Sequence, residues 1–296
     1  MKVLLIINST KKNADRLADR LLSELRQEHL VEISKTNARR HALSIARDSA
    51  ANFDAMVAVG GDGTVHECVC GLMEYIRANP GAKLPLFTVV PNGTGNDYAR
   101  NFQWKNYPGM LSSLLTRNTV RKVDVLEITG NNGVDWAINV LDIGLGPVVV
   151  RNVEHIPRIL GSSLRFRIAI LLGFISFRKR VLSVQSAAGS YSGKSLIIAV
   201  AKGKYFGSGI GVSPRAEVSD GKLHVTVVGD VSVWTYLRHL GTLKKCQPIS
   251  HRGVKYLEAT EIELGNSGAI ETDGEMSHLE LPVKVIVRPA IIPLLV

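Results

Sequence analysis

The sequence predicts an α/β protein in two parts. The first part is a doubly wound, mostly parallel sheet, because apolar strand patterns alternate with helical ones up to about residue 123. The second part is a β-rich antiparallel domain, because short strands then recur between glycine turns. A length of 296 residues suits two domains. We therefore expect residues 1–123 to form one domain, which residues 288–296 rejoin, and residues 124–287 to form the other.

Strands and helices of the first part follow from hydrophobic periodicity. The helices carry apolar residues at four-residue spacing, as at Leu17, Leu21 and Leu25, whereas the strands are short apolar runs. Thr64 and Glu67 have the spacing of a capping box, which predicts a helix start beside them. In chain order we expect strand 3–7, helix 14–28, strand 31–33, helix 38–50, strand 53–59, helix 65–76 and strand 86–90.

The second part shows short strands and only two clear helical patterns. Its predicted strands are 136–140, 181–186, 196–201, 223–228, 256–264 and 283–287. Its predicted helices are 165–177 and 233–243. The apolar residues Trp234, Leu237 and Leu240 of the second helix indicate packing rather than cofactor binding.

Composition excludes several classes of protein. Lys and Arg total 36 against 26 Asp and Glu, a formal charge of +10, which favours anionic partners such as nucleotides, nucleic acid or membrane surfaces. The three cysteines form no zinc framework, so we expect reduced thiols. No signal peptide is evident, and the uncharged stretch 168–177 is too short to span a bilayer. We expect a cytoplasmic protein.

A first glycine loop, 60–64, joins a predicted strand directly to a helix. Glycines let the backbone approach a bulky anion, and the helix N-terminus supplies N–H donors. The loop is neither a Walker A motif nor a full dinucleotide fingerprint, since His66 occupies the place of the third glycine. The carboxylate of Asp62 suggests a nearby Mg²⁺ or a hydrogen bond to ribose or to a substrate hydroxyl. A tight turn without ligand is the alternative.

A second glycine loop, Pro91-Asn92-Gly93-Thr94-Gly95-Asn96-Asp97, follows the next predicted strand. In a parallel sheet both loops lie at the carboxyl ends of their strands. That edge is where open α/β sheets bind ligands. Two such loops favour a ligand site over a pair of bare turns.

Together the two loops resemble the catalytic domain of the diacylglycerol kinase and sphingosine kinase superfamily, in particular its soluble bacterial lipid kinases, which are related to NAD kinases. The resemblance implies a nucleotide-binding domain followed by a lipid-substrate domain, with ATP as substrate and Mg²⁺ as cofactor. The nucleotide-binding residues that it implies are Asn8, Thr36, Gly60, Gly61, Asp62, Gly63, Thr64, Asn92, Gly93, Thr94, Asn96 and Asp97.

The same resemblance extends to catalytic candidates. Glu275, in the Asp-Gly-Glu segment 273–275, corresponds to the general base that takes the proton of a lipid hydroxyl. Asp124 corresponds to an aspartate near the active site, and Asp62 is the carboxylate nearest to the Mg²⁺ of the nucleotide. Glu275 and Asp124 could instead be ordinary turn residues.

Residues 214–223 resemble a loop that holds a structural Mg²⁺. The ligands implied are the Asp220 carboxylate and the carbonyl oxygens of Glu217 and Lys222. An Asp-Gly hairpin turn is the alternative and is compatible with an ion. Gly146 stands where many members of the family carry aspartate.

The resulting expectation is an ATP-dependent lipid kinase that converts diacylglycerol to phosphatidate, with ceramide or a sphingoid base as other lipid candidates. One alternative is an NAD kinase-like kinase of a soluble substrate. Another is a non-catalytic anion-binding regulatory protein. No nucleic-acid-binding motif is present, so we expect no nucleic-acid partner.

The basic and apolar stretch 158–180 predicts peripheral contact with the inner, anionic face of a membrane. A core helix with solvated basic ends, including Arg178, Lys179 and Arg180, is the alternative. An exposed sheet edge could pair two copies as a homodimer.

Overall fold

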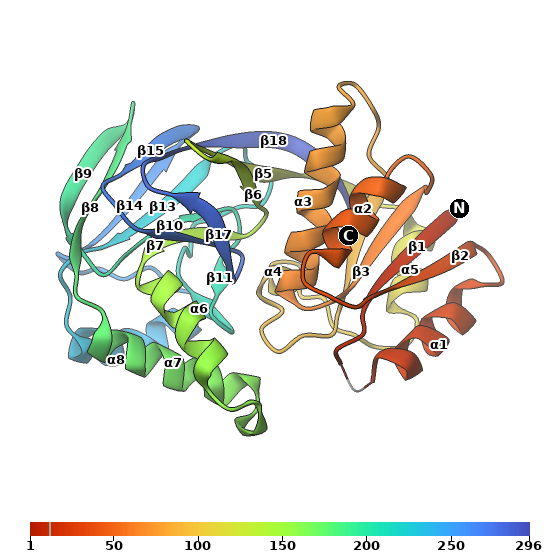
Figure 1. Cartoon of the computed structure of the whole chain (residues 1–296), viewed down its shortest axis with the longest axis horizontal. Helices are drawn as coiled ribbons and strands as arrows, with labels where there is room; N and C mark the ends of the chain where they lie inside the picture. The colour runs from red at the N-terminus through yellow and green to blue at the C-terminus, as the bar shows by residue number, and fades with distance from the viewer. Residues whose placement is uncertain (12) are drawn as a thin grey trace. The chain divides into compact units, whose positions relative to one another are not determined.

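The computed structural model describes residues 1–11 and 13–296. The chain divides into two compact units (Figure 1). The first unit contains residues 1–123 and 290–296, and the second contains residues 124–289. The chain crosses from the first unit to the second once within β5 (Val120–Gly130), and it returns within β18 (Val283–Leu295).

The first unit is built on a parallel sheet, in the strand order β2-β1-β3-β4. The end of β18 adds a further parallel strand, in which Leu294 pairs with Phe87 of β4. Strands β1 and β3 are almost entirely buried, as expected for a sheet that is covered on both faces. Their bounds are β1 Lys2–Asn8, β2 Leu30–Thr36, β3 Ala55–Gly60 and β4 Leu86–Pro91.

Helices cover both faces of this sheet (Figure 1). Helices α1 and α5 pack on the face that carries Val3, Leu5 and Ile7, while α2 and α3 contact the other face. Because successive side chains of a strand alternate between faces, each buried strand serves both layers. The helix bounds are α1 Ala14–Leu25, α2 His41–Ser49, α3 Asp62–Ala78, α4 Asp97–Arg100 and α5 Met110–Arg117. The predicted doubly wound, mostly parallel sheet is confirmed.

The predicted capping box at Thr64 and Glu67 is wrong. Helix α3 begins at Asp62, so Thr64 lies inside its first turn. The carboxylate of Glu67 instead accepts hydrogen bonds from the backbone N–H groups of Arg40 (2.8 Å) and Ala42 (3.0 Å). Glu67 therefore caps the start of the neighbouring helix α2, a tertiary contact that local spacing does not reveal.

The second unit contains two antiparallel sheets. One has the strand order β14-β13-β10-β7-β16-β17. The other contains β18-β15-β8-β9, and β5 forms a hairpin with β6. The remaining pair, β11 (Tyr205–Phe206) and β12 (Ile210–Gly211), forms a small ribbon. The other bounds are β6 Gly133–Ala137, β7 Val140–Gly144, β8 Arg180–Ser186, β9 Gly189–Ser195, β10 Ile197–Ala201, β13 Leu223–Val228, β14 Val254–Ala259, β15 Glu261–Gly265, β16 Ala269–Thr272 and β17 Glu275–Glu280.

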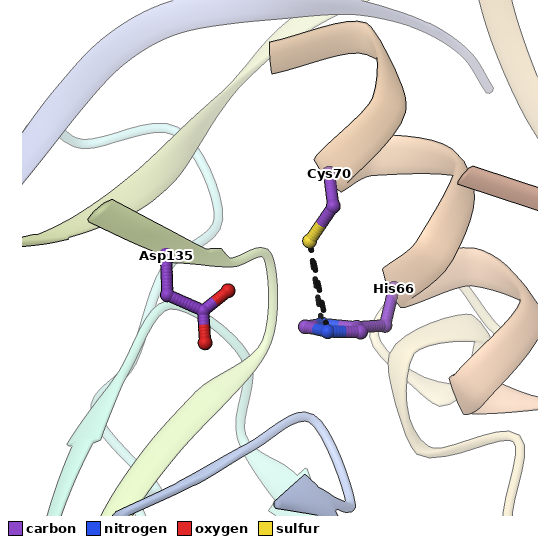
Figure 2. Close-up of side chains that lie close together, drawn as sticks. All are labelled: His66, Cys70 and Asp135. Carbon is purple, nitrogen blue, oxygen red and sulfur yellow. Dashed lines mark hydrogen bonds between the residues drawn. The ribbon is translucent and has the colours of Figure 1, made fainter. Parts of the chain in front are cut away.

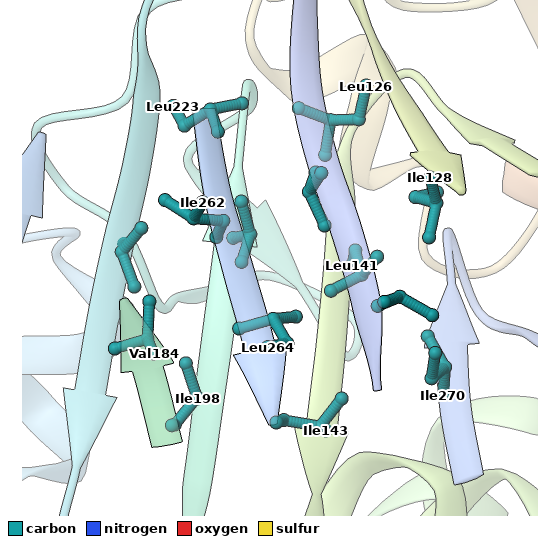
Figure 3. Packing of buried hydrophobic residues seen from close by; sticks show 14 of the residues in the cluster. Leu126, Ile128, Leu141, Ile143, Val184, Ile198, Leu223, Ile262, Leu264 and Ile270 are labelled. Carbon is teal, nitrogen blue, oxygen red and sulfur yellow. The ribbon is translucent and has the colours of Figure 1, made fainter. Parts of the chain in front are cut away.

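Apolar side chains from the two sheets form one core (Figure 3). Leu141 of β7 and Ile198 of β10 come from the first sheet, and Leu264 of β15 comes from the second. All three are fully buried. Burial of aliphatic side chains between two sheets is the main stabilising term of a sandwich. The predicted antiparallel β-rich domain is confirmed.

Three α-helices and one 3₁₀ turn of the second unit lie outside these sheets. They are α6 (Leu145–His155), η1 (Arg158–Leu160), α7 (Ser162–Ser176) and α8 (Val233–Lys244). The sequence predicted α7 and α8 but not α6, because α6 contains Gly146 and three consecutive valines, which are poor helix formers. None of the helices in residues 1–11 and 13–296 is long and apolar enough to cross a bilayer.

Helices α2 and α3 approach closely at Gly71, which provides a test of the packing. A Cβ atom at Gly71 would lie 2.2 Å from the Leu43 carbonyl oxygen and 3.0 Å from the Ala46 Cβ. We predict that Gly71→Ala lowers the free energy of unfolding by roughly 1–3 kcal/mol, despite the higher helix propensity of alanine. Denaturant unfolding measures this change.

Gly241, in α8, is the matched control because a Cβ there would meet no atom within 4 Å. Gly241→Ala should raise the free energy of unfolding by about 0.5–1 kcal/mol through helix propensity alone. Equal effects of the two substitutions would contradict the close helix contact.

Candidate functional site

The two glycine loops lie together at one edge of the first unit's sheet. Strands β3 and β4 pair in parallel up to Gly60 and Pro91, and the Asn92 N–H donates a 2.7 Å hydrogen bond to the Gly60 carbonyl. A Cβ on Gly93 would lie 2.4 Å from the Cα of Gly61. The two loops therefore touch backbone to backbone, and only glycine permits this contact.

The second loop is fixed by its own side chain. The Gly93 N–H donates to Oδ1 of Asn96, and Nδ2 of Asn96 donates to the Gly93 carbonyl, both at 2.9 Å. Asn96 has a φ of 49°, which asparagine tolerates better than most residues. Thr94, at the tip of this loop, is exposed. The loop thus presents a hydroxyl group and backbone groups from a rigid turn.

Asp62 connects the two loops. Its Oδ1 accepts a 3.0 Å hydrogen bond from the N–H of Tyr98, which lies beyond the second loop in α4. Its Oδ2 would be 2.9 Å from a Cβ on Gly95, and Oδ2 of Asp97 would be 3.4 Å from the same point. Two carboxylates therefore lie beside Gly95. Carboxylate oxygens are hard donors that suit Mg²⁺, so the residues here fit that ion.

Asn8 reaches the first loop from β1. Its Nδ2 donates to Oγ1 of Thr64 at 3.3 Å. The Thr64 side chain in turn lies against Gly60. A Cβ atom on Gly60 would be 2.3 Å from Oγ1 of Thr64. Thr36 pairs with Asn8 in the β1–β2 register, and its carbonyl accepts the Ser9 hydroxyl. Gly63 lies in the first turn of α3. The predicted nucleotide residues of the first unit thus gather at one sheet edge.

Beside the first loop, α3 carries His66 and Cys70 one turn apart (Figure 2). The thiol of Cys70 lies 3.6 Å from Nε2 of His66. Burial raises the pKa of the neighbouring Cys68 thiol well above its ordinary value, so that thiol stays protonated. Figure 2 also labels Asp135 of β6, whose carboxylate accepts hydrogen bonds from the Ser277 hydroxyl (2.5 Å) within the second unit.

The Asp-Gly-Glu turn lies between β16 and β17. The Asp273 carboxylate accepts three backbone N–H groups, from Ile138, Asn139 and Val140, each at 2.9 Å. These bonds interrupt the strand that the sequence predicted at 136–140, which is why β6 ends at 137 and β7 begins at 140. Glu275 follows as the first residue of β17 and is partly exposed.

A buried carboxylate pair, which the sequence analysis missed, supports this turn. Asp142 of β7 and Glu271 of β16 are direct cross-strand partners, and they are 0% and 2% exposed. Glu271 also accepts the N–H of Gly274 in the turn. A Cβ on Gly146 would lie 2.0 Å from the Asp142 carboxylate, so this position has no room for a side chain. Acidic residues within otherwise apolar strands were the available signal.

Burial raises the pKa of both acids. The pKa of Asp142 rises to about 6, against smaller lowering contributions from Glu271 and from the N–H of Gly146. The pKa of Glu271 lies well above its ordinary value, first because of burial and then because of the charge of Asp142. Burial and the charge of Asp142 therefore both favour the protonated form of Glu271.

The predicted metal loop brings Asp124, Asp220 and Lys222 together. The Asp124 carboxylate is buried and accepts the N–H of Gly221 at 2.8 Å. The buried side chain of Lys202 lies among them and binds both aspartates. The Glu217 carboxylate instead pairs at 3.3 Å with Lys204, a contact near the surface.

Comparison with known sequences decides the family. Residues 2–128 match the diacylglycerol kinase catalytic domain, and residues 139–296 match the YegS C-terminal NAD kinase beta sandwich-like domain. The chain belongs to the YegS-like lipid kinase family. The resemblance inferred from the two glycine loops is thereby confirmed, and the YegS-type second domain accounts for the β-rich half.

Relatives of this YegS-like chain support the assignment. A protein of Xanthomonas euvesicatoria pv. vesicatoria (strain 85-10), named "Probable lipid kinase YegS-like", is 30% identical over 181 residues. That match covers 60% of this chain and 56% of the relative, so it spans little more than half of the relative's length. A relative of the same name from Pectobacterium atrosepticum is 26% identical over 76% of this chain and 73% of its own length.

A solved structure shares the fold. A crystal structure described as a diacylglycerol kinase from Bacillus anthracis str. Sterne aligns with a TM-score of 0.74 and 19% identity. The alignment covers 99% of this chain and 96% of that one. At this identity the similarity shows that the YegS-like fold extends over both units.

The raised pKa of Asp142 predicts a pH-dependent stability difference. The pKa of Asp142 in the native protein is about 6, above the ordinary value of 3.8. The protonated carboxyl group therefore stabilises the native protein at low pH, and this contribution is lost as the pH rises through 6. Asp142→Asn removes this titration. The free energy of unfolding of Asp142→Asn, relative to that of wild type, should therefore increase by about 1 kcal/mol or more between roughly pH 5 and pH 8.

Urea unfolding at the two pH values measures this difference. Asp19→Asn, at an exposed position of α1, is the matched control and should show the same advantage at both pH values. An Asp142→Asn advantage that stays constant with pH would show that the buried pair does not hold its proton as described.

Proposed function

We propose that this chain is an ATP-dependent lipid kinase that transfers the γ-phosphate of ATP to the hydroxyl of a lipid alcohol, first of all diacylglycerol, to form phosphatidate. The observation that carries the proposal is the contact between the two glycine loops, where Gly61 and Gly93 meet without side chains at the carboxyl edge of β3 and β4. Family membership supports the reaction class.

In this proposal the loops of the first unit bind the phosphates of ATP. Gly60, Gly61 and Gly63 leave the backbone accessible, and α3 begins directly at Asp62, so its N-terminal dipole favours the anion. Thr94, exposed on the second loop, supplies a hydroxyl donor. Bound Mg²⁺ would neutralise charge on the phosphate oxygens, and Asp62 and Asp97 are the carboxylates placed to hold it.

The same proposal assigns the proton transfer to Glu275. The lipid hydroxyl oxygen forms a bond to the γ-phosphorus, the bond from that phosphorus to the bridging oxygen of ADP breaks, and the hydroxyl proton passes to the Glu275 carboxylate. The Asp273 carboxylate holds the preceding turn through three backbone N–H groups. Phosphoryl transfer depends mainly on positioning, and such a fixed turn supplies it.

We further propose that the second unit contacts an anionic membrane, where its substrate resides. Large apolar side chains are exposed on η1 and α7, which follow one another in sequence, and on α8, whose Tyr236 ring contacts the Phe174 ring of α7. These residues are Ile159, Leu160, Leu164, Leu171, Leu172, Ile175, Trp234 and Leu237. Exposed apolar side chains in such number mark an interaction surface.

The exposure of Trp234 shows that one prediction for helix α8 is wrong. The sequence predicted that Trp234 and Leu237 pack inward, but they are 79% and 46% exposed. The opposite face of α8 makes the packing contact, since the rings of Tyr236 and Phe174 of α7 lie 4.8 Å apart. An exposed tryptophan is suited to the interface between water and lipid.

The charge of the surrounding residues favours an anionic membrane as the partner that binds this surface. Residues 155–180 and 231–257 contain six and five Lys or Arg residues and no Asp or Glu. Arg167, Arg178 and Arg238 are exposed beside the apolar residues. The exposed Asp230 pairs with Lys179 at the edge of this surface, so the cationic side chains remain in clear excess. A surface that combines apolar side chains with an excess of cationic ones complements an anionic bilayer.

The kinase proposal predicts label transfer from γ-labelled ATP to diacylglycerol in mixed micelles with Mg²⁺. Glu275→Gln should lower kcat by roughly 100- to 10,000-fold, because the amide cannot accept the proton. ATP affinity, measured by calorimetry, should remain unchanged because the proposed nucleotide loops lie in the first unit. Ceramide, sphingosine and NAD are tested as competing acceptors.

Glu280, at the other end of β17, provides the matched control because it is exposed. Glu280→Gln should leave kcat unchanged. Label in NAD alone would favour an NAD kinase-like enzyme, and absence of label in every acceptor would favour an anion-binding protein. Either result would refute the lipid kinase proposal.

The membrane proposal predicts co-sedimentation with vesicles that contain phosphatidylglycerol but weaker binding to pure phosphatidylcholine vesicles. The double variant Ile175→Ser/Trp234→Ser should bind at least about tenfold more weakly, because two large apolar groups no longer enter the bilayer. Added salt should weaken wild-type binding.

The control for the membrane experiment is Leu30→Ser. Leu30 is 75% exposed but belongs to β2 of the first unit, so its loss should not change vesicle binding. Wild-type binding by the double variant would locate the membrane contact elsewhere or exclude it.

A further inference from the structure

A lysine side chain is completely buried in the second unit. Lys202, the first residue after β10, is 0% exposed. Its Nζ lies 2.7 Å from Asp124 Oδ2, 2.6 Å from Asp220 Oδ1 and 2.7 Å from the carbonyl oxygen of Lys222. An ammonium group has three N–H donors, and three oxygen acceptors surround this one. Lysine is rarely buried completely unless it is paired in this way.

The loop of residues 217–222 folds around this ammonium group. Asp220 accepts the N–H of Lys222 at 3.1 Å and the imidazole of His224 at 2.8 Å. The Gly221 N–H, from a residue with a φ of 71°, donates to the Asp124 carboxylate. Burial acts to raise the pKa of Asp220, but the hydrogen bonds from Lys202, His224 and the Lys222 backbone lower it overall. Asp220 is therefore held as an anion.

These oxygens include two of the three that the sequence assigned to a structural Mg²⁺. The Asp220 carboxylate and the Lys222 carbonyl both bind the ammonium of Lys202. An ion sharing these oxygens at about 2.1 Å would lie within a few ångströms of a positive charge in a buried place, where repulsion is strong. The residues present therefore do not fit the Mg²⁺ ion.

We propose that the ammonium group of Lys202 is the fixed structural cation of this loop and replaces a divalent metal ion. The lysine neutralises one of the two aspartate charges and satisfies the carbonyl, which is the work that a bound cation would do. Folding of the loop is then independent of Mg²⁺, and Mg²⁺ is required only with the nucleotide. The inference concerns stability and does not rest on the proposed kinase activity.

Thermal unfolding without nucleotide tests the proposal. Without nucleotide, wild-type Tm should be the same, within about 1 °C, in Mg²⁺ and in EDTA, because the loop of residues 217–222 offers no divalent site for the ion to stabilise. Lys202→Ala should lower the Tm by roughly 10 °C, since the buried carboxylate of Asp124 and the partly exposed one of Asp220 lose their cation. Mg²⁺ or Ca²⁺ should restore at least half of that loss, because the truncated side chain leaves room for the ion.

Two further variants separate this effect from general stabilisation by salt. Lys202→Met removes the charge but fills the space, so its Tm should fall without recovery in Mg²⁺. Lys204→Ala removes a neighbouring lysine whose ion pair with Glu217 is partly exposed. Its Tm should stay close to that of wild type, with no dependence on divalent ions.

A wild-type Tm that rises in Mg²⁺, with a rise that Asp220→Asn abolishes, would overturn the proposal. Equal recovery of Lys202→Ala and Lys202→Met in Mg²⁺ would also overturn it. If Lys202→Ala does not fold in EDTA, its refolding in Mg²⁺ but not in Na⁺ at equal ionic strength is the supporting result. The proposal is contradicted if Lys202→Ala refolds in neither salt and the wild-type Tm depends on Mg²⁺.

Discussion

The in-register pairing of β3 with β4 is the constraint on which the candidate nucleotide site depends. The two strands end together at Gly60 and Pro91, so both loops leave the sheet at the same level. The starts of the two loops are then one strand spacing apart, and a hydrogen bond from the Asn92 N–H to the Gly60 carbonyl joins them. At that distance a side chain on Gly61 or Gly93 would collide with the opposite backbone. The glycines therefore follow from the sheet geometry as well as from any ligand.

In the second unit, buried acids and not glycines set the local geometry. The Asp273 carboxylate takes three N–H groups that a continuous strand would have used in its ladder, so the chain divides into β6 and β7. Glu271 binds the same turn at Gly274, and Asp142 lies opposite Glu271 on the neighbouring strand, where its charge raises the pKa of Glu271. The turn that carries Glu275 is thus held by polar contacts in a dry interior, where such contacts are strongest.

The sequence was sufficient for those features that depend on local pattern. Alternation of strands and helices predicted the parallel sheet, and two glycine loops after successive strands predicted that they meet. The contacts it could not predict join residues far apart in the chain. Glu67 caps α2 and not its own helix, and Trp234 faces outward although its spacing suggested packing. Lys202 occupies a loop that the local motif assigned to a metal ion, because no local pattern shows where a long side chain from another strand ends.

The second unit compensates two pairs of acids by two different means, and three of the four acids are buried. Asp142 and Glu271 are adjacent without a cation, so a proton must neutralise one of them, and the cost of ionising both rises with pH. Asp124 and Asp220 have the ammonium of Lys202 between them, so a cation and not a proton offsets their charge. The buried carboxyl group of Asp142, with a pKa of about 6, titrates just below neutral pH. The turn before Glu275 therefore carries a pH dependence through its buried acids, whereas the Asp220 loop is tied to a lysine side chain within the same β-rich unit.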